Sequence, residues 1–177
     1  MSHEHPYEFR VWAYVADLVE ATQKSGRDRS LAELQFLGFF AARLLDAKFF
    51  RYREGGWQPR SFEFDEVVYA MCTAACLSEN QAGISLTPEG ATRADRYRET
   101  ELRGDLFALV SELKDLDLHA LHLLATACST GKLPDRQTRI QILCDIRPGL
   151  EPLAAEKSLS RADDLLAKSR ARTFALA

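Results

Sequence analysis

Ile84-Ser-Leu-Thr-Pro-Glu-Gly90 changes from the pattern of a β-strand to that of a helix within a few residues. The segment 83–87 alternates small or polar with apolar side chains, as a strand with one buried face does. Pro88 follows directly, and proline is favoured at the first position of a helix because its missing N–H would have no partner there. We therefore predict a short strand over 83–87 that leads into a helix over 88–98.

Upstream of this stretch, the spacing of apolar residues predicts three helices and a further strand. Residues 7–24 carry an apolar face with spacings of three and four, formed by Val11, Tyr14, Val15, Leu18 and Val19. Asp28 or Ser30 can cap a second helix that continues to about residue 48. Aromatic and basic side chains alternate over 49–53, which predicts a short strand before the turn residues of 55–59. A third helix is predicted over 64–77.

Downstream of residue 104 the sequence is typical of helices alone. Apolar periodicity predicts helices over 106–116, 118–129, 136–146 and about 152–170. None of the connections between them has the composition of a linker, and 177 residues suit one compact domain. We therefore expect a mainly α single domain with a short β-hairpin in its middle.

Composition places the chain among ordinary globular proteins. It is 46% apolar and 28% charged, so it is neither disordered nor fibrous. The longest apolar stretches, such as 34–42, are far shorter than a bilayer span, and the first residues lack the layout of a signal peptide. We expect a cytoplasmic protein with no membrane contact. The four cysteines fall in apolar, helix-like segments, which favours reduced core residues.

Several motifs resemble those of one family of winged-helix proteins. Leu34-Gln-Phe-Leu-Gly-Phe-Phe40 is similar to the Leu-Gln-x-Leu-x-Phe helix of YwgA-like and Panacea-type bacterial proteins, in which an aromatic strand follows, as at 49–52. The 84–90 stretch resembles a wing strand that runs into Leu-Thr-x-x-Gly. The match continues through Leu121-His-Leu-Leu-Ala-Thr126, Ile146-Arg-Pro148 and Ala162-Asp-Asp-Leu-Leu166. The usual Gly-Pro after the aromatic strand is replaced here by Gln58-Pro-Arg-Ser61.

The resemblance implies both a fold and a function. The fold is mainly α, with a winged-helix-like core over about 7–103 and a helical C-terminal extension over about 104–177 packed on it, together forming the single domain 1–177. Proteins of this kind include antitoxin-like and phage-associated proteins and small middle components of three-component ABC/SMC-like ATPase defence systems. The resemblance thus implies a non-enzymatic accessory subunit in antiviral defence, whose partners are an SMC-like or ABC-type ATPase and an effector nuclease.

Charge argues against direct DNA binding as the main activity. The net charge is −3, and the predicted third helix contains no Lys or Arg and opens with Asp65 and Glu66. These acids suit the positive end of the helix dipole but would face phosphates. A DNA-binding regulator or antitoxin is the alternative, with Arg93 and Arg96 as possible nucleic-acid contacts beside the basic turn at 51–60.

Two basic groups of residues are candidates for contact with a partner. Around the turn, Arg51, Arg53 and Arg60 accompany Tyr52 and Trp57, the mixture of arginine and aromatic side chains that is typical of interface hot spots. The second group lies along the last predicted helix and comprises Lys157, Arg161, Lys168, Arg170 and Arg172. Such runs are more often solvated faces. We predict partner binding at the first group.

Signatures of catalysis and of metal binding are missing. The sequence contains no nucleophile elbow, no P-loop and no dinucleotide-binding glycine pattern. Cys72 and Cys76 lie one helical turn apart without a second ligand pair, and His119 and His122 lack the spacing of a hydrolytic site. We therefore predict no catalytic residue, cofactor or metal. An enzyme would require a pocket that joins these histidines to acids such as Asp115 and Asp117.

Overall fold

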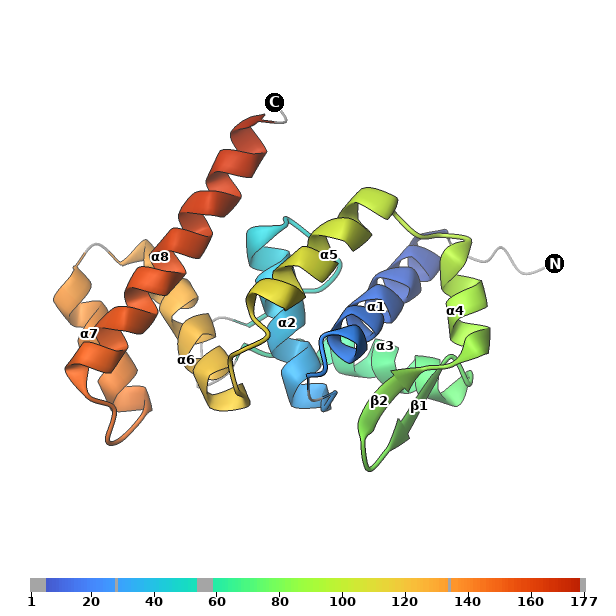
Figure 1. Cartoon of the computed structure of the whole chain (residues 1–177), viewed down its shortest axis with the longest axis horizontal. Coiled ribbons are helices and arrows are strands. Elements are labelled where there is room, and N and C mark those ends of the chain that lie inside the picture. The colour runs from blue at the N-terminus through green and yellow to red at the C-terminus, as the bar shows by residue number, and fades with distance from the viewer. Residues whose placement is uncertain (1–5, 28, 54–58, 134, 176–177) are drawn as a thin grey trace. The chain divides into compact units, whose positions relative to one another are not determined.

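A computed structural model of the chain describes residues 6–27, 29–53, 59–133 and 135–175 (Figure 1). These residues form a mainly helical protein with eight α-helices and one antiparallel hairpin. They divide into two compact units. Unit 1 comprises the described residues of 1–51 and 61–115. Unit 2 comprises the described residues of 52–60 and 116–175. The predicted core ended at about residue 103, whereas unit 1 also includes the next helix.

Unit 1 is built around its first helix. α1 (Pro6–Lys24) packs against α2 (Leu31–Leu44), α3 (Phe62–Thr73), α4 (Pro88–Asp95), α5 (Thr100–Glu112) and the second strand of the hairpin. The apolar face predicted for α1, including Val15, Leu18 and Val19, is buried. Ser30 caps α2 by accepting a hydrogen bond from the Glu33 N–H, so Ser30 is the cap; Asp28 lies outside the described residues.

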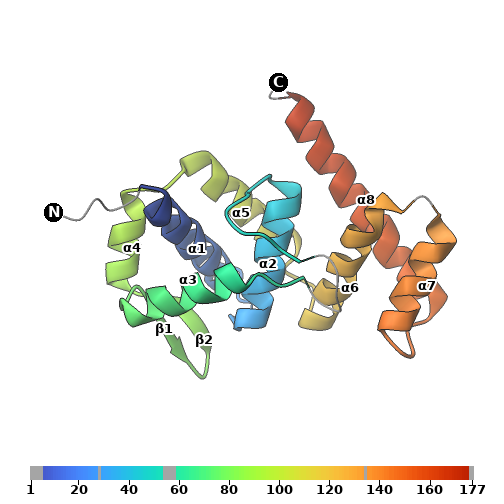
Figure 2. The same cartoon turned by 180° about the vertical axis from the view of Figure 1, so that it is seen from behind.

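The hairpin follows α3 directly (Figure 2). β1 (Leu77–Asn80) pairs antiparallel with β2 (Gly83–Leu86), with Leu77 opposite Leu86. The prediction of a helix over 64–77 was wrong at both ends, because Ser61 caps α3 and the helix stops at Thr73. Ala75 then takes a left-handed conformation (φ 56°), which turns the chain out of the helix and into β1.

The stretch 84–90 is held against the end of α3 by a small set of polar contacts. The Thr87 hydroxyl donates to the Ala75 carbonyl oxygen (2.7 Å) and accepts from the Gly90 N–H (3.0 Å), so Thr87 is also the N-cap of α4. The Thr87 N–H donates to the Cys76 carbonyl oxygen (3.1 Å). A Cβ on Gly90 would overlap that oxygen and would lie 2.8 Å from the Cys76 carbonyl carbon. The Leu-Thr-x-x-Gly motif at 86–90 therefore serves to pack α4 against the end of α3.

The aromatic segment after α2 is not a strand. α2 ends at Leu44 rather than near residue 48, and Asp46 has a positive φ (56°) that turns the chain. The strand predicted over 49–53 is wrong, since only a single bridge joins Arg53 to Arg60. The rings of Phe49 and Phe50 both pack on Tyr14, with centroids 4.8 and 5.9 Å away. Two consecutive side chains that face the core cannot alternate as a strand requires.

Unit 2 consists mainly of three helices. α6 (Leu118–Ser129) and α7 (Arg136–Ile146) both pack on α8 (Pro152–Ala175), and a 3-10 turn, η1 (Thr130–Lys132), follows α6. The bounds of α6 and α7 confirm the prediction. The core is apolar and includes Leu121, Leu124, Leu143, Leu159 and Leu165. Among the described helices of the whole chain, none has the length and apolar content that a membrane crossing requires.

The Gly90 contact gives the first prediction. Gly90→Ala should lower the free energy of unfolding by about 3 kcal/mol, because the methyl group forces α4 away from the Cys76 backbone. Gly104→Ala is the matched control: it is also a helical glycine, and a Cβ there meets no atom within 4 Å. The control should be neutral or stabilising by up to about 1 kcal/mol. Urea unfolding of both variants measures the difference, and equal stabilities would contradict this packing.

Candidate functional site

The residues predicted for partner binding do not form one described surface. Arg51 belongs to unit 1, whereas Tyr52, Arg53 and Arg60 belong to unit 2. The three arginines are exposed and Tyr52 is half-buried. Trp57 lies outside the described residues. The cluster as a whole therefore stays a prediction, and only Arg51 can be related to the surface of unit 1.

The two arginines predicted to contact nucleic acid lie on or beside α4. Arg93 is exposed, and its guanidinium pairs with Glu89 at 2.8 Å. Arg96 is the exposed C-cap of the same helix. Because the charge of Arg93 is already partly balanced by Glu89, this helix offers a weaker attraction for phosphate than its sequence suggests.

The exposed side of α3 carries an aromatic and acidic stripe that the sequence analysis missed. We call Phe62, Glu66, Tyr69 and Thr73 the α3 stripe. Their spacings of four, three and four residues place them on one side of the helix, and all four are exposed. The side chains of Phe62 and Tyr69 stand out, being 54% and 76% exposed. The core-facing side of α3 is formed by other residues, namely Phe64, Val68 and Met71.

A groove borders the α3 stripe. It has a volume of about 460 Å³ and lies between the start of α1, the segment after α2, and α3. Tyr7, Trp12 and Phe49 give it an aromatic lining, and Arg51, Glu63 and Val67 complete the side toward α3. Glu63 accepts a hydrogen bond from the Arg51 N–H (3.1 Å), which joins the chain after α2 to α3. Tyr7, at the start of α1, is 57% exposed.

The charge of this surface is predominantly acidic along α3. The helix contains no Lys or Arg, while Glu63 and Glu66 are exposed. Lys48, on the far wall of the groove, is paired with Asp46 at 2.7 Å. Exposed carboxylates next to exposed rings repel phosphate and favour a partner with basic and apolar side chains.

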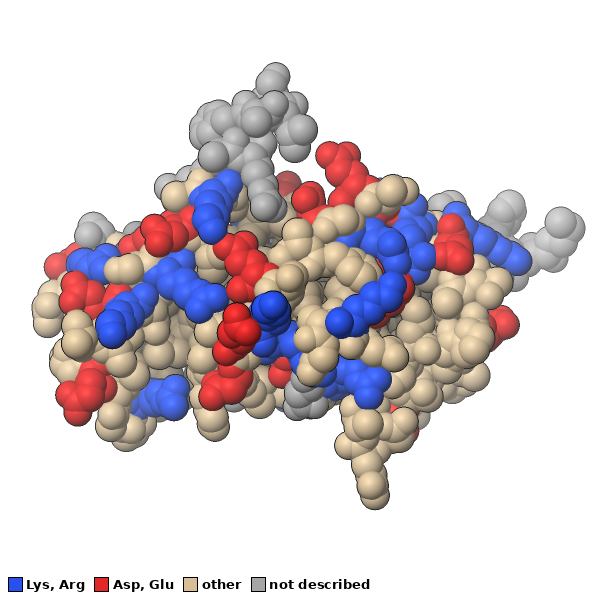
Figure 3. All heavy atoms as spheres, in the orientation of Figure 1, with Lys and Arg blue, Asp and Glu red and all other residues tan. Residues whose placement is uncertain are grey.

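The hairpin offers no cation for nucleic acid either. The segment 77–86 contains no Lys or Arg, and Figure 3 shows the projecting hairpin without a blue side chain at its tip. Arg29, which comes from the loop before α2, donates to the Ser85 hydroxyl (2.8 Å) and to the Ala82 carbonyl oxygen (2.9 Å). Its donors are thus used to hold the hairpin to the unit.

A network of ion pairs fixes the position of α1 against the 95–103 region. The Asp17 carboxylate is buried and lies 2.7 Å from Arg98 and 3.3 Å from Arg103. Burial raises the pKa of Asp17 although both arginines act to lower it. Partial burial also acts to raise the pKa of Glu20, but hydrogen bonds from Lys24 and Arg103 outweigh it and leave that pKa below its ordinary value. The network is structural, because its charges are satisfied internally.

The residues weighed for chemistry are spread over both units. Cys76 and Cys128 are buried, Cys72 and Cys144 are half-buried, and all four lie outside any disulfide. His119 is exposed and His122 half-buried on α6. Within the described part of the chain, no group of three or more His, Cys, Asp or Glu residues is placed to hold a metal ion.

Comparison of the chain with protein-family models, with curated proteins and with solved structures found no match. The resemblance to YwgA-like proteins therefore stays a prediction that rests on the motifs themselves.

The lowered pKa of Glu20 predicts a pH-dependent contribution to stability. A carboxylate whose pKa falls on folding stabilises the protein above its unfolded pKa, and this contribution is lost as the pH falls through the folded pKa. Glu20→Gln should therefore cost about 1 kcal/mol at neutral pH and progressively less as the pH falls below the ordinary pKa of a glutamate, about 4.3. Thermal unfolding of the wild type and of Glu20→Gln between neutral and acidic pH measures this loss of stability. Glu66→Gln, on the exposed α3 stripe, is the control and should change little at any pH; a constant penalty for Glu20→Gln would contradict the assignment.

Proposed function

We propose that the protein is a non-enzymatic accessory subunit that acts through protein–protein contacts, and that unit 1 is a winged-helix domain. The order α1, α2, α3, hairpin β1–β2, α4 supports the winged-helix assignment, with the hairpin in the place of the wing. In that arrangement the helix before the wing is the one that DNA-binding relatives of the fold place in the major groove. Here that helix is α3.

The observation that carries the proposal is the chemistry of the exposed side of α3. A helix that reads DNA needs Arg, Lys, Asn or Gln side chains to reach base edges and cations to meet phosphates. The α3 stripe instead presents Phe62, Tyr69 and Glu66, with Glu63 beside it. Exposed aromatic side chains with few rotatable bonds are typical anchors of protein interfaces. We therefore assign the α3 stripe as the surface by which unit 1 binds a protein.

The size of the surface suits a hot spot within a larger interface. Phe and Tyr side chains each bury about 150–250 Å² when fully covered, and such anchors commonly cost about 2 kcal/mol or more when truncated. The aromatic groove with Tyr7 and Trp12 extends the apolar area, and Glu63 and Glu66 provide charge for selecting a basic partner. The partner surface should therefore combine Arg or Lys side chains with an apolar pocket.

The nature of the partners follows from the family resemblance. Small middle components of three-component defence systems are encoded beside an ABC-type or SMC-like ATPase and an effector nuclease. We propose that this protein joins such components in the cytoplasm and contributes to antiviral defence. DNA would then be contacted mainly through the ATPase and nuclease.

Co-expression with the proteins of the neighbouring genes tests this proposal. The wild-type chain should co-purify with one of them at a fixed stoichiometry in size-exclusion chromatography with light scattering. Phe62→Ala and Tyr69→Ala should each weaken the complex about 10- to 30-fold, because each removes an exposed aromatic anchor. Tyr69→Phe keeps the ring and should retain most of the affinity.

The matched control is Leu153→Ala, which truncates another exposed apolar side chain, on unit 2. It should leave the complex intact. If no neighbouring protein binds, or if Phe62→Ala and Tyr69→Ala bind as well as wild type, the assignment of the α3 stripe is wrong. Binding to duplex DNA that is tight, salt-dependent and lost with Arg93→Ala would instead favour the DNA-binding alternative.

A further inference from the structure

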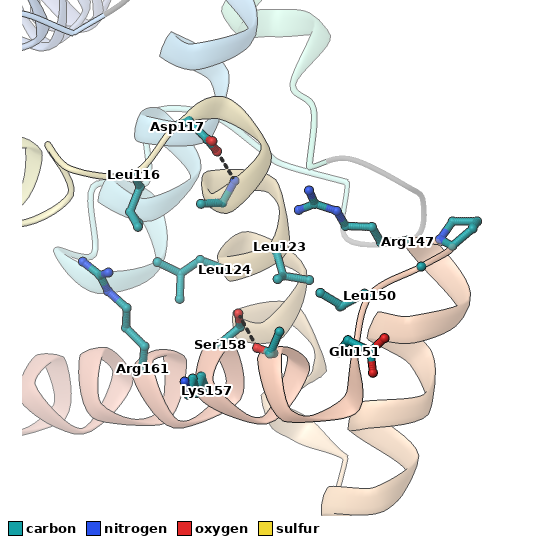
Figure 4. A pocket seen from close by; sticks show the side chains of 14 residues that line it. Leu116, Asp117, Leu123, Leu124, Arg147, Leu150, Glu151, Lys157, Ser158 and Arg161 are labelled. Carbon is teal, nitrogen blue, oxygen red and sulfur yellow. Dashed lines mark hydrogen bonds between the residues drawn. The ribbon is translucent and has the colours of Figure 1, made fainter.

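Unit 2 contains a groove with an apolar floor. It has a volume of about 700 Å³ and lies between the start of α6, the 147–151 segment and the first turns of α8 (Figure 4). The side chains of Leu123, Leu124 and Leu150 point toward one another across its floor (Figure 4). Leu123 and Leu124 also belong to the buried core of the unit, and Leu150 is half-buried. A groove of this size accommodates several side chains of a ligand.

The rim of this groove is basic. Arg147 stands on one wall, and Lys157 and Arg161 stand on α8 along the other (Figure 4). All three are exposed. Lys157 and Arg161 are four residues apart, so they lie on the same side of α8, about one turn apart. Among the described residues, the side chains of Arg147 and Lys157 make no ion pair.

Two arginines of α7, by contrast, are cations with a structural role. Arg139 is buried and pairs with Asp163 at 2.7 Å, and Arg136 lies 3.3 Å from the same carboxylate. Those charges hold α7 to α8. Arg147 and Lys157 have no such role, and they are exposed on two different walls of the groove.

Two acids on the rim reduce the positive charge without cancelling it. The Asp117 carboxylate accepts a hydrogen bond from the Ala120 N–H (2.7 Å) as the N-cap of α6, so much of its charge is offset by the positive end of that helix. Glu151 is exposed at the start of α8. Three cations against two acids leave the lining with a net positive charge.

We infer that this groove binds an acidic, leucine-rich segment of a protein partner, with apolar side chains on the leucine floor and carboxylates on Arg147 and Lys157. Charge complementarity selects carboxylates, and the apolar floor selects a segment that alternates them with Leu or a similar side chain. Nucleic acid fits less well, because the lining contains no aromatic side chain on which a base could stack. This site lies within unit 2 and is independent of the α3 stripe, so either assignment can fail without the other.

Fluorescence anisotropy with defined peptides tests the inference on the full chain. The probe is a labelled amphipathic peptide of about 14 residues, or about four helical turns, that repeats Glu-Leu-Leu-Glu. Two further peptides replace every Glu by Lys or every Leu by Ser. The acidic leucine peptide should bind at least about ten-fold more tightly than either of the others, since it alone satisfies both the rim and the floor.

Charge-reversal variants locate the site. Arg147→Glu and Lys157→Glu should each weaken the acidic peptide about ten-fold, and Leu150→Ser should weaken it through the floor. Arg96→Glu, which reverses an exposed cation on unit 1, is the control and should bind as wild type. Thermal unfolding verifies that each variant is folded, and a variant that is not folded is replaced by Lys157→Gln or Arg147→Gln.

Several results would overturn the inference. They are no binding of the acidic peptide, equal binding of the serine or lysine peptides, or tighter binding of a single-stranded oligonucleotide at the same variants. A wild-type dimer in light scattering that Arg147→Glu dissociates would instead make a second copy of the chain the occupant.

Discussion

The close approach of Gly90 to the backbone of Cys76 is the constraint on which the architecture of unit 1 depends. It lets α4 start directly against the end of α3, while Thr87 bonds to the Ala75 and Cys76 carbonyl oxygens and caps α4. The hairpin is thereby fixed immediately after α3, and Arg29 holds it from its other side. Because α3 is held at its C-terminal end in this way and at its start by the Ser61 cap, its outer side can remain uncovered. An exposed aromatic surface on a rigid helix is better prepared for binding than one on a loop, since less entropy is lost on association.

The sequence predicted α1 well, because one apolar face dominates that helix, and it also predicted the bounds of α6 and α7, which Asp117 and Asp135 cap. The prediction of secondary structure failed where the sequence pattern of a helix or strand conflicts with the way the side chains pack. Residues 62–77 carry apolar side chains on both sides of α3 and into β1, so periodicity extended the helix past Thr73, and only the left-handed Ala75 reveals the turn. The 49–53 segment has the aromatic content of a strand, yet Phe49 and Phe50 pack on Tyr14 instead. The α3 stripe was missed because the predicted helix began at residue 64, which left Phe62 outside it, and because the apolar residues of that helix were interpreted as one buried face. The spacing of Phe62 and Tyr69 would have indicated the stripe. These two residues lie seven positions apart on one side of the helix, whereas the core-facing side carries Phe64, Val68 and Met71.

The two units present surfaces of opposite chemistry. In unit 1 the exposed side of α3 is aromatic and acidic, and in unit 2 the groove beside α8 is apolar with a basic rim. In a chain with a net charge of −3, such a separation gives each surface a different preferred partner. An accessory subunit that links two larger proteins needs two surfaces of different chemistry, since one surface that binds both proteins equally well would not distinguish them. The buried ion pairs of Asp17 and Arg139, by contrast, satisfy their charges within each unit and serve the fold.

Site-specific cross-linking in the native host tests the central claim most directly. A photoreactive phenylalanine analogue in place of Tyr69 should give one discrete protein adduct, which mass spectrometry identifies as an ATPase or effector encoded beside this protein. The adduct should be lost when Phe62→Ala is added, and the same analogue in place of Leu153 should not form it. An adduct of the same identity and yield from both positions, or cross-linking at position 69 to DNA alone, would contradict the claim that α3 is a protein-binding helix.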